Sequence, residues 1–285
     1  MKTLKITVVS VFIALAVLDG SFAVAASKKV IVVSDIDDTL KVAHILNPVR
    51  AAARVANYSA HFTGMAQLFQ LLARQPGTQT DFVYLSNAPS NIAGIKTWLP
   101  AHQKFLEHNN FPAGKLNLRD DFFEKDHKII EIRKLVNLYA PDVIIFLGDN
   151  GERDTEIYQQ AVREFQSTPI QFYTFIHQVY KTEKGIFDRP FHPEIGKKLK
   201  PFQTGFITPV EIALELHQQG LLDAPAITWI VDDLAPFIAA EAFYDVDIVG
   251  AISFPSFLKC RDFVWRWPLT NALVPLVRKI KSVCR

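Results

Sequence analysis

The sequence predicts an α/β fold, a doubly wound parallel sheet of the Rossmann type with helices on both faces. Short apolar runs rich in β-branched residues alternate along the chain with segments whose apolar residues recur at helical spacing. The chain has 285 residues and is 49% hydrophobic, which is enough to bury a substantial core. Acidic and hydroxyl side chains directly follow several of the apolar runs, at the sheet edge where ligands bind.

The alternation that predicts this sheet runs from residue 30 to residue 176. Strands are expected at residues 30–34, 81–85, 115–118, 143–147 and 170–176. Helices are expected at residues 62–74, 91–108 with a break at Pro100, 126–139 and 155–165. Right-handed crossovers put the carboxyl ends of parallel strands on one edge. Because no sizeable lid is left over between these elements, we expect a minimal cap and an open site.

The part of the chain after residue 180 begins with a predicted loop at residues 181–202, which are rich in Lys, Pro and Gly. Thr208, Pro209 and Glu211 then match an N-cap, a proline at the first helical position and the glutamate of a capping box. A helix is therefore expected over residues 208–217.

Two further strands are expected at residues 227–231 and 247–252, where they would extend the same sheet. Asp232 and Asp233 follow the first of them. We interpret this acid pair as an exposed helix cap rather than as a second site.

Asp35, Asp37 and Thr39 follow the strand expected at residues 30–34. In a tight turn, two acids spaced two residues apart can approach one divalent cation and one phosphoryl group. Asp35 would do so through its side chain and Asp37 partly through its backbone carbonyl. Hard oxygen ligands of this kind suit Mg²⁺. For this segment alone, the alternative is an acidic cap of the next helix.

Three further segments place matching side chains at the same edge. Ser86 and Asn87 end the second expected strand and offer a hydroxyl and backbone N–H groups to phosphate oxygens. Lys128 begins a helix, where a cation can neutralise a phosphoryl group. Asp149 and Asp154 follow the fourth expected strand and supply two more carboxylates, of which Asp154 is also expected to cap the next helix.

These elements together resemble the haloacid dehalogenase superfamily of phosphotransferases. Its nucleophile motif Asp-x-Asp-x-Thr corresponds to residues 35–39, its second motif to Ser86, its third to Lys128 and its fourth to Gly148-Asp149 with Asp154. The chain is more closely similar to the actin-patch-type phosphatidate phosphatase catalytic domain family, over residues 30–179. This likeness rests on residues 34–41, 64–65, 84–89, 111–114, 118–119, 127–128 and 148–158.

The resemblance implies a haloacid dehalogenase-like fold and a Mg²⁺-dependent phosphomonoester hydrolase. Asp35 would attack phosphorus and form an aspartyl-phosphate, while Asp37 would act as general acid and then as general base. Ser86 and Lys128 would stabilise charge on the phosphoryl oxygens. Phosphatidate is the implied substrate. The remaining assignments are substrate contacts by Thr39 and Asn87, and metal ligation by Asp35, Asp37, Asp149 and Asp154.

Two alternatives stay open on the sequence alone. The same chemistry can serve a soluble or protein phosphomonoester instead of a lipid. In a different class of protein, the chain would be a non-catalytic phospholipid-binding module that uses its pocket only for a headgroup. The presence of Asp35 together with Asp37, Lys128 and Asp149 favours turnover, because related binding modules can lose the nucleophile.

The N-terminal residues have the pattern of an export signal. Lys2 and Lys5 precede the apolar residues 6–18, and Ala23-Val24-Ala25 fits the small-x-small site of a signal peptidase. This run is shorter than the roughly 20 residues that a transmembrane helix needs. We expect a signal peptide at residues 1–25 and an exported protein, periplasmic or secreted. The alternative is an uncleaved anchor.

The catalytic domain with its C-terminal sheet extension is expected at residues 26–250, followed by a basic aromatic tail at residues 251–285. The tail has seven basic residues and one acid, Asp262. Its interleaved aromatics and cations favour peripheral contact with an anionic membrane, and the alternative is packing on the core. Cys260 and Cys284 can form a disulfide or remain buried thiols. The net charge of +2 gives no case for a nucleic-acid partner.

Overall fold

The computed structural model describes residues 27–47, 50–51, 54–90, 98–120, 124–184, 194–241, 243–244, 254–255 and 260–284. The expected signal peptide at residues 1–25 and the expected strand at residues 247–252 lie outside these residues. None of the helices in the described ranges combines the length and the apolar character needed to cross a membrane.

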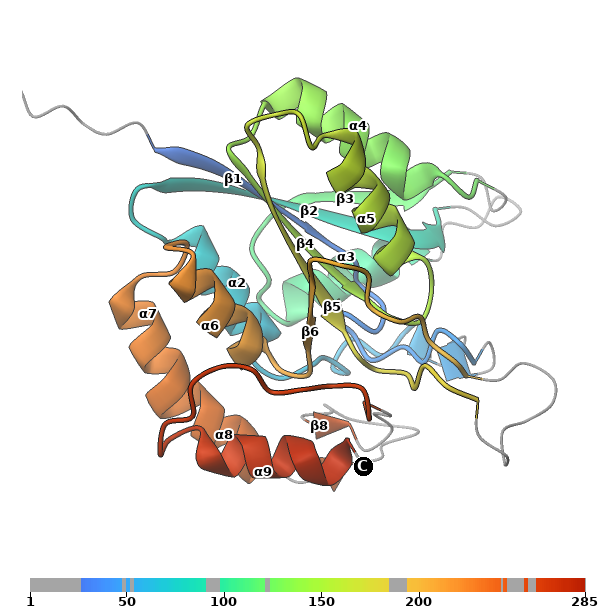
Figure 1. The fold of residues 1–285 in the computed structure, drawn as a ribbon. Coiled ribbons are helices and arrows are strands. Elements are labelled where there is room, and N and C mark those ends of the chain that lie inside the picture. The colour runs from blue at the N-terminus through green and yellow to red at the C-terminus, as the bar shows by residue number, and fades with distance from the viewer. Residues whose placement is uncertain are drawn as a thin grey trace, which may run out of the picture.

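A parallel sheet of six strands lies at the centre, in the order β3-β2-β1-β4-β5-β6 (Figure 1). The chain leaves β1 towards β2 and β3 and then returns to β4, so the order reverses between β1 and β4. The predicted doubly wound α/β fold is thus confirmed. Ligands bind outside the carboxyl ends of the strands at such a switch point. The strands are β1 (Lys28–Ser34), β2 (Thr78–Pro89), β3 (Lys115–Arg119), β4 (Val143–Asp149), β5 (Gln171–His177) and β6 (Gln203–Phe206).

The register of β1 brings the predicted site residues together. Ser34, the last residue of β1, is aligned with Tyr84 of β2 on one side and with Leu147 of β4 on the other. Asp35 therefore leaves the sheet beside Ser86 and Asp149, each of which lies two positions beyond the residue aligned with Ser34. Its backbone N–H still bonds to the Leu147 carbonyl, at 2.8 Å.

Helices cover both faces of the sheet (Figure 1). Ile31 and Val33 of β1 pack into the core under α4 (His127–Tyr139) and α5 (Asp154–Glu164). The alternate residues Val30 and Val32 pack into the core on the opposite face. That second core lies under α2 (Met65–Ala73), α3 (Trp98–His108) and α6 (Pro209–Gln218). The uninterrupted apolar character of β1 follows from this burial on both faces.

Residues 227–231 are helical, so the strand predicted there is wrong. They belong to α7 (Ala224–Trp229) and a π-helical turn (Ile230–Leu234), which continue into α8 (Ala235–Ala240). The Asp223 side chain caps α7 by accepting from the Ala226 N–H at 2.9 Å. The buried residues recur at helical spacing, which a short apolar run does not reveal by itself. They are Ala226, Ile227, Ile230, Leu234 and Ile238.

Asp232 and Asp233 lie within this helical stretch, on its exposed side, and not at a helix N-terminus. The expectation that they cap a helix is therefore also wrong. The sheet is instead extended by β6, which pairs with β5 and directly follows the predicted loop. The next prediction is confirmed, since Thr208 and Glu211 form the capping box that begins α6.

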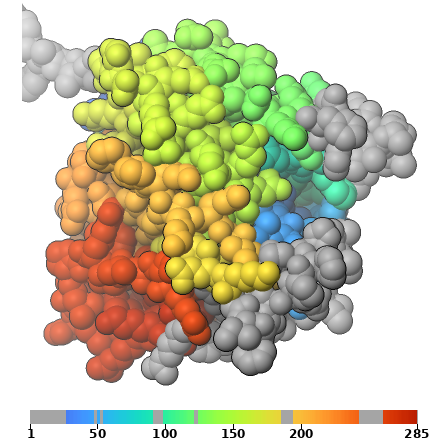
Figure 2. Space-filling model, turned by 45° about the vertical axis from the view of Figure 1, so that its right-hand side comes forward, coloured from blue at the N-terminus to red at the C-terminus, as the bar shows by residue number. Residues whose placement is uncertain are grey.

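The described part of the C-terminal segment packs on the rest of the molecule, and in Figure 2 its red surface adjoins the orange surface of the preceding part of the chain. Cys260 and Cys284 form a disulfide, with the sulfur atoms 1.98 Å apart. Trp267 is buried, and α9 (Val274–Val283) lies against α8. The Lys279 amine is buried as well and donates to the Ile238 carbonyl at 2.7 Å. A short parallel pair, β7 (Phe243–Tyr244) and β8 (Phe254–Pro255), lies between α8 and this segment in the sequence.

Glu211 makes the stability of the fold depend on pH. Burial raises the pKa of its fully buried carboxyl to about 7, although Thr208 and Ile207 donate hydrogen bonds to it. The folded state thus favours the protonated form. Its contribution to stability is largest at low pH and is lost as the pH rises from the unfolded value to the folded one.

We expect the free energy of unfolding of the wild type, relative to Glu211→Gln, to fall by about 3 kcal/mol between pH 4.5 and pH 8. Urea unfolding of both proteins across this range measures the difference. The buried His177, whose pKa burial lowers to about 4, acts in the opposite direction but equally in both proteins. Exposed Glu107→Gln serves as the control and should track the wild type. Parallel curves for wild type and Glu211→Gln would contradict the prediction.

Candidate active site

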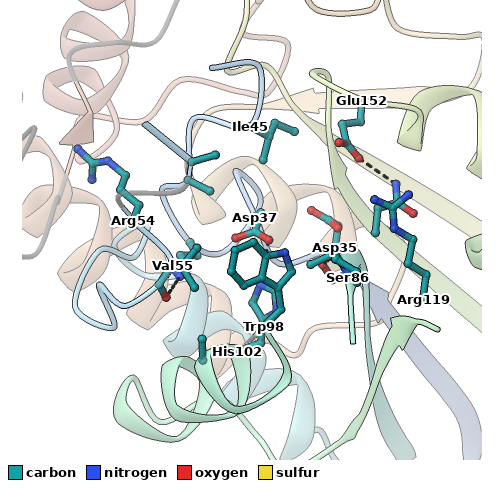
Figure 3. Close-up of a pocket in the computed structure, with 17 residues that line it drawn as sticks. Asp35, Asp37, Ile45, Arg54, Val55, Ser86, Trp98, His102, Arg119 and Glu152 are labelled. Carbon is teal, nitrogen blue, oxygen red and sulfur yellow. Dashed lines mark hydrogen bonds and ion pairs between the residues drawn. The ribbon is translucent and has the colours of Figure 1, made fainter. Parts of the chain in front are cut away.

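A pocket of about 250 Å³ opens beside the carboxyl ends of β1 and β2 (Figure 3). The loop after β1 contributes Asp35 and Asp37, and the end of β2 contributes Ser86 and Asn87. The segment after this loop forms one wall, and α3 forms another. The remaining residues that line the pocket are Lys41, Ala43, Ile45, Ala51, Arg54, Val55, Ala88, Pro89, Trp98, Ala101, His102, Arg119 and Glu152.

Lys128 lies at the base of the site between two carboxylates. Its amine donates to Asp35 Oδ1 at 2.7 Å and to Asp154 Oδ1 at 2.5 Å. All three side chains are almost inaccessible to solvent. Lys128 is the second residue of α4, and its neighbour Ile129 anchors that turn in the core. Docking of the helix on the sheet thus delivers the amine to the end of β1.

The electrostatics of this cluster favour a charged lysine. Burial lowers the pKa of Lys128, but the nearby Asp154 and Asp35 carboxylates raise it well above its usual value. Burial also raises the pKa values of Asp35 and Asp149 well above the usual range, and the neighbouring carboxylates raise them further. One ammonium group therefore does not neutralise these acids, and a further cation would lower their pKa values.

Asp35, Asp149 and Asp154 form a group that suits a metal ion. Each offers one carboxylate oxygen, and these oxygens lie within 4.8 Å of one another. The backbone between them is closely packed, because a Cβ at Gly148 would lie 2.5 Å from Asp154 Oδ2. Three buried carboxyl groups share a single ammonium partner and offer hard oxygen ligands, so the residues fit a divalent cation. These are three of the four predicted metal ligands.

The side chain of the fourth, Asp37, is held elsewhere. Its Oδ2 lies 2.9 Å from Nε2 of His102 on α3, and the carboxyl lines the pocket. Burial raises the pKa of Asp37, but the charge and hydrogen bond of His102 lower it below the usual value. The acids of the motif therefore have different partners, a lysine for Asp35 and a histidine for Asp37.

The other predicted residues lie around Asp35. The Thr39 hydroxyl is buried and donates to Asp35 Oδ2 at 3.3 Å. Ser86 lines the pocket, and its Oγ accepts from the Ala88 N–H at 3.0 Å. The Asn87 amide donates to Glu152 Oε2 at 2.9 Å and so connects the end of β2 with the loop after β4. Substrate contacts by Thr39 and Asn87 stay predictions.

Asp154 does not cap α5 as the sequence led us to expect. Arg153 occupies the cap position, and Asp154 is the first helical residue. Its carboxylate instead accepts from Lys128, and its second oxygen accepts from the Asp149 N–H at 3.4 Å. The buried lysine competes successfully for this side chain because a charge-assisted bond is stronger than a neutral cap.

Asp38 shapes the wall of the pocket. Its backbone has a φ of 60°, and its carboxylate accepts from the N–H groups of Ala43, His44 and Ile45 at 2.8–2.9 Å. The Tyr180 hydroxyl donates to the same carboxylate at 2.5 Å. These bonds fold the segment after β1 over one side of the pocket. The expected minimal cap is thus a short wall whose described residues include Ala43, Ile45 and Val55.

Several pocket residues escaped the sequence analysis. His102 and Trp98 come from α3, and Lys41, Arg54 and Arg119 come from three other segments. Lys41 and Arg119 lie in segments that carry the family resemblance, at residues 34–41 and 118–119, but the sequence analysis assigned no role to either side chain. Trp98, His102 and Arg54 lie in none of those segments. A partial signal exists for His102, because it precedes the buried Phe105 by three residues and therefore belongs to the apolar face of its helix.

The sheet order and the cluster of Asp35, Asp149 and Asp154 beside Lys128 are consistent with a haloacid dehalogenase-like phosphatase. The family model described as phosphatidate phosphatase APP1, catalytic domain, matches residues 30–178. Since this is more than half of the chain, the protein belongs to that family, and membership indicates an enzyme that is a phosphatidate phosphatase. The resemblance inferred from the sequence is thereby confirmed. A comparison with curated proteins gives no match.

Replacement of Lys128 by methionine tests the electrostatics of the cluster. The variant leaves Asp35, Asp149 and Asp154 buried without their cation, at an expected cost of about 3 kcal/mol in the free energy of unfolding. A divalent cation should recover more stability in the variant than in the wild type. Thermal unfolding with EDTA and with Mg²⁺ measures both effects. Lys134→Met, on the same helix but exposed, is the matched control. Equal stability of Lys128→Met and wild type in EDTA would contradict the prediction.

Proposed function

We propose that the protein is a Mg²⁺-dependent phosphatidate phosphatase that works through an aspartyl-phosphate on Asp35. The observation that carries the proposal is the buried contact of Asp35 with Lys128 and Asp154, next to Asp149. It combines a nucleophilic carboxylate, a fixed cation and a set of hard ligands at the switch point of the sheet. The family match supports the lipid substrate.

In the first step, a carboxylate oxygen of Asp35 attacks phosphorus, and the bond from phosphorus to the leaving oxygen breaks. Asp37 gives its proton to that oxygen, which leaves as the alcohol. In the second step, Asp37 accepts a proton from water, and the water oxygen attacks phosphorus. The bond between phosphorus and Asp35 breaks, which regenerates the carboxylate and releases phosphate. Different partners hold the two acids, Lys128 for Asp35 and His102 for Asp37.

Lys128 stabilises the negative charge around the phosphoryl group, and Ser86 presents its hydroxyl from the pocket wall. Asp35, Asp149 and Asp154 would hold Mg²⁺. The backbone carbonyl of Asp37 would be a further ligand, as the spacing of the two acids in the sequence suggests. When bound, the ion supplies positive charge that offsets the repulsion between the nucleophile and the phosphate.

The apolar lining of the pocket favours an acylated alcohol as the leaving group. Asp37 marks the leaving-group side, since it protonates the departing oxygen. Beyond it, Ala43, Ile45, Val55 and Trp98 give the wall an apolar surface. A cavity of about 250 Å³ holds a headgroup but leaves acyl chains outside. The chains would remain in a bilayer during turnover.

The central test is Asp35→Asn. The amide is nearly isosteric but a poor nucleophile, so phosphate release from phosphatidate should fall by at least about three orders of magnitude. Wild-type release should also be lost in EDTA and return with Mg²⁺. Asp232→Asn, the same change at an exposed acid, should keep wild-type activity. An active Asp35→Asn would overturn the mechanism, and an EDTA-resistant wild type would overturn the metal requirement. Activity on soluble phosphate esters without activity on phosphatidate would contradict the assignment of a lipid substrate.

We also propose peripheral membrane contact through the exposed cations of α9, Arg278 and Lys281. Activity on phosphatidate in anionic vesicles should exceed that in neutral ones. The double variant Arg278→Ala/Lys281→Ala should reduce this difference, because each lost cation weakens binding to the anionic surface by about 1 kcal/mol at low salt. Hydrolysis of a soluble monoester should not change. The control is Lys28→Ala/Lys29→Ala, which removes two exposed cations from the amino end of β1. Lys279 stays unchanged because its amine bonds inside the fold. Equal losses on lipid and soluble substrates would refute membrane contact by α9.

A further inference from the structure

His102 lies outside the strand-end motifs but contacts Asp37, the proposed general acid. It belongs to α3, after the second motif, and its ring is buried at the pocket wall (Figure 3). Its Nε2 lies 2.9 Å from Asp37 Oδ2. The next residue on the same face, Phe105, packs in the core and fixes this part of the helix. The position of the imidazole is therefore set by tertiary packing and not by the loop that carries Asp37.

The hydrogen bond has a defined direction. A carboxylate only accepts, so Nε2 of His102 carries the hydrogen and donates it. Nδ1 is buried and has no hydrogen-bond partner among the described residues. Within the described part of the chain, the polar contact of this imidazole is thus the one with Asp37. Burial of an imidazole with one nitrogen unsatisfied costs free energy, which packing alone does not require.

The hydrogen bond with His102 occupies only one of the two carboxyl oxygens of Asp37. Oδ2 is held, whereas Oδ1 accepts no hydrogen bond from any described residue. The side chain of Asp37 retains 22% of its exposure and lines the pocket. One oxygen is therefore fixed from behind while the other is available to a ligand. A general acid needs this arrangement, because proton transfer requires a hydrogen-bond distance and a fixed direction.

We propose that His102 is a positioning residue for the reaction. By donating to Oδ2, it holds the plane of the Asp37 carboxyl so that Oδ1 faces the leaving oxygen and later the attacking water. The inference rests on the proposed function, in which Asp37 transfers these protons. It assigns to the His102 imidazole the orientation of the Asp37 carboxyl. The imidazole itself exchanges no proton with the substrate.

Without this bond, Asp37 has a competing orientation. Lys41 also lines the pocket, and its charge acts on Asp37. Its amine donates to the Val55 carbonyl at 2.9 Å, on the wall formed by the segment after β1. A carboxyl released by His102 can turn towards this cation and away from the leaving oxygen. Loss of His102 should therefore affect the proton-transfer role of Asp37 rather than nucleophilic attack by Asp35.

The dependence on the leaving group separates positioning from general support of the fold. An alkoxide leaves poorly without a proton, whereas p-nitrophenolate leaves readily. A misaligned Asp37 should consequently slow the hydrolysis of a glycerolipid phosphate far more than that of p-nitrophenyl phosphate. A variant that merely loosens the pocket should slow both to the same degree.

The experiment compares kcat/KM for dioctanoyl phosphatidate and for p-nitrophenyl phosphate in His102→Phe, His102→Asn, His102→Gln and Asp37→Asn, all with Mg²⁺. The amide nitrogen of Gln reaches the place of Nε2, whereas that of Asn does not. We expect His102→Phe and His102→Asn to lose about 10- to 100-fold on the lipid and less than about 3-fold on the aryl ester. His102→Gln should stay within about 5-fold of wild type on both. His108→Phe, an exposed change on the same helix, is the control.

Coupling to Asp37 gives a second readout. If His102 acts through Asp37, His102→Asn/Asp37→Asn should be no slower on the lipid than Asp37→Asn alone. Additive losses, equal losses on both substrates, or no loss in His102→Asn would each overturn the inference. If His102→Phe fails to fold, the Asn and Gln pair still decides the question. Wild-type activity of Asp37→Asn on the lipid would instead refute the general-acid step of the proposed function, whatever His102 does.

Discussion

The arrangement of acids at the carboxyl edge of the sheet depends on the ammonium group of Lys128, which is buried between Asp35 and Asp154. Burial of three charged side chains costs several kcal/mol per ion, and close ion pairing has to offset that cost. The pairing exists only if α4 docks on the sheet with Ile129 and Ile132 in the core. Hydrophobic packing thus positions the charge, and the charge in turn keeps two carboxylates close together.

A second set of buried polar contacts holds the rim of the site. The Asp38 carboxylate bonds to three successive backbone N–H groups of the wall and to the Tyr180 hydroxyl. Asn150, just after β4, exchanges two hydrogen bonds with the backbone of Tyr180, at 2.6 and 2.9 Å. The loops after β1, β4 and β5 are therefore one connected network. Rigid loops of this kind reduce the reorganisation that a reaction would otherwise require.

Elements beyond the family match extend the sheet by one strand and add to the core on its face opposite α4 and α5. The sixth strand, the helices α6 to α8 and the disulfide-bonded C-terminal segment follow residue 178. They add Val210, Leu216 and Ile230 to the larger core. Arg266 joins the segment to this layer through an ion pair with Glu215 of α6, at 2.9 Å, while its guanidinium lies over Trp267. The core that supports the site is thus shared with residues far from it in sequence.

The sequence by itself determined the sheet class and the acidic edge. The short apolar run at residues 143–147, within a regular alternation of such runs with helical segments, predicted a strand buried on both faces, and parallel strands carry their following residues to one edge. Asp35, Ser86 and Asp149 lie close together at that edge for this reason. Thr208 and Glu211 likewise fixed a helix start through local hydrogen bonds. These are features whose cause lies within a few neighbouring residues or in a general rule of topology.

The tertiary structure decided what depends on contacts between distant segments. Residues 227–231 became helical because the helical spacing of buried residues continues through α8, beyond the short apolar run. The Asp154 carboxylate binds Lys128 instead of capping α5, because α4 places a buried cation next to it. His102 reached Asp37 across 65 residues, and Cys260 paired with Cys284 only when α9 brought the two together. No local pattern encodes such distances, since they are set by how whole elements pack.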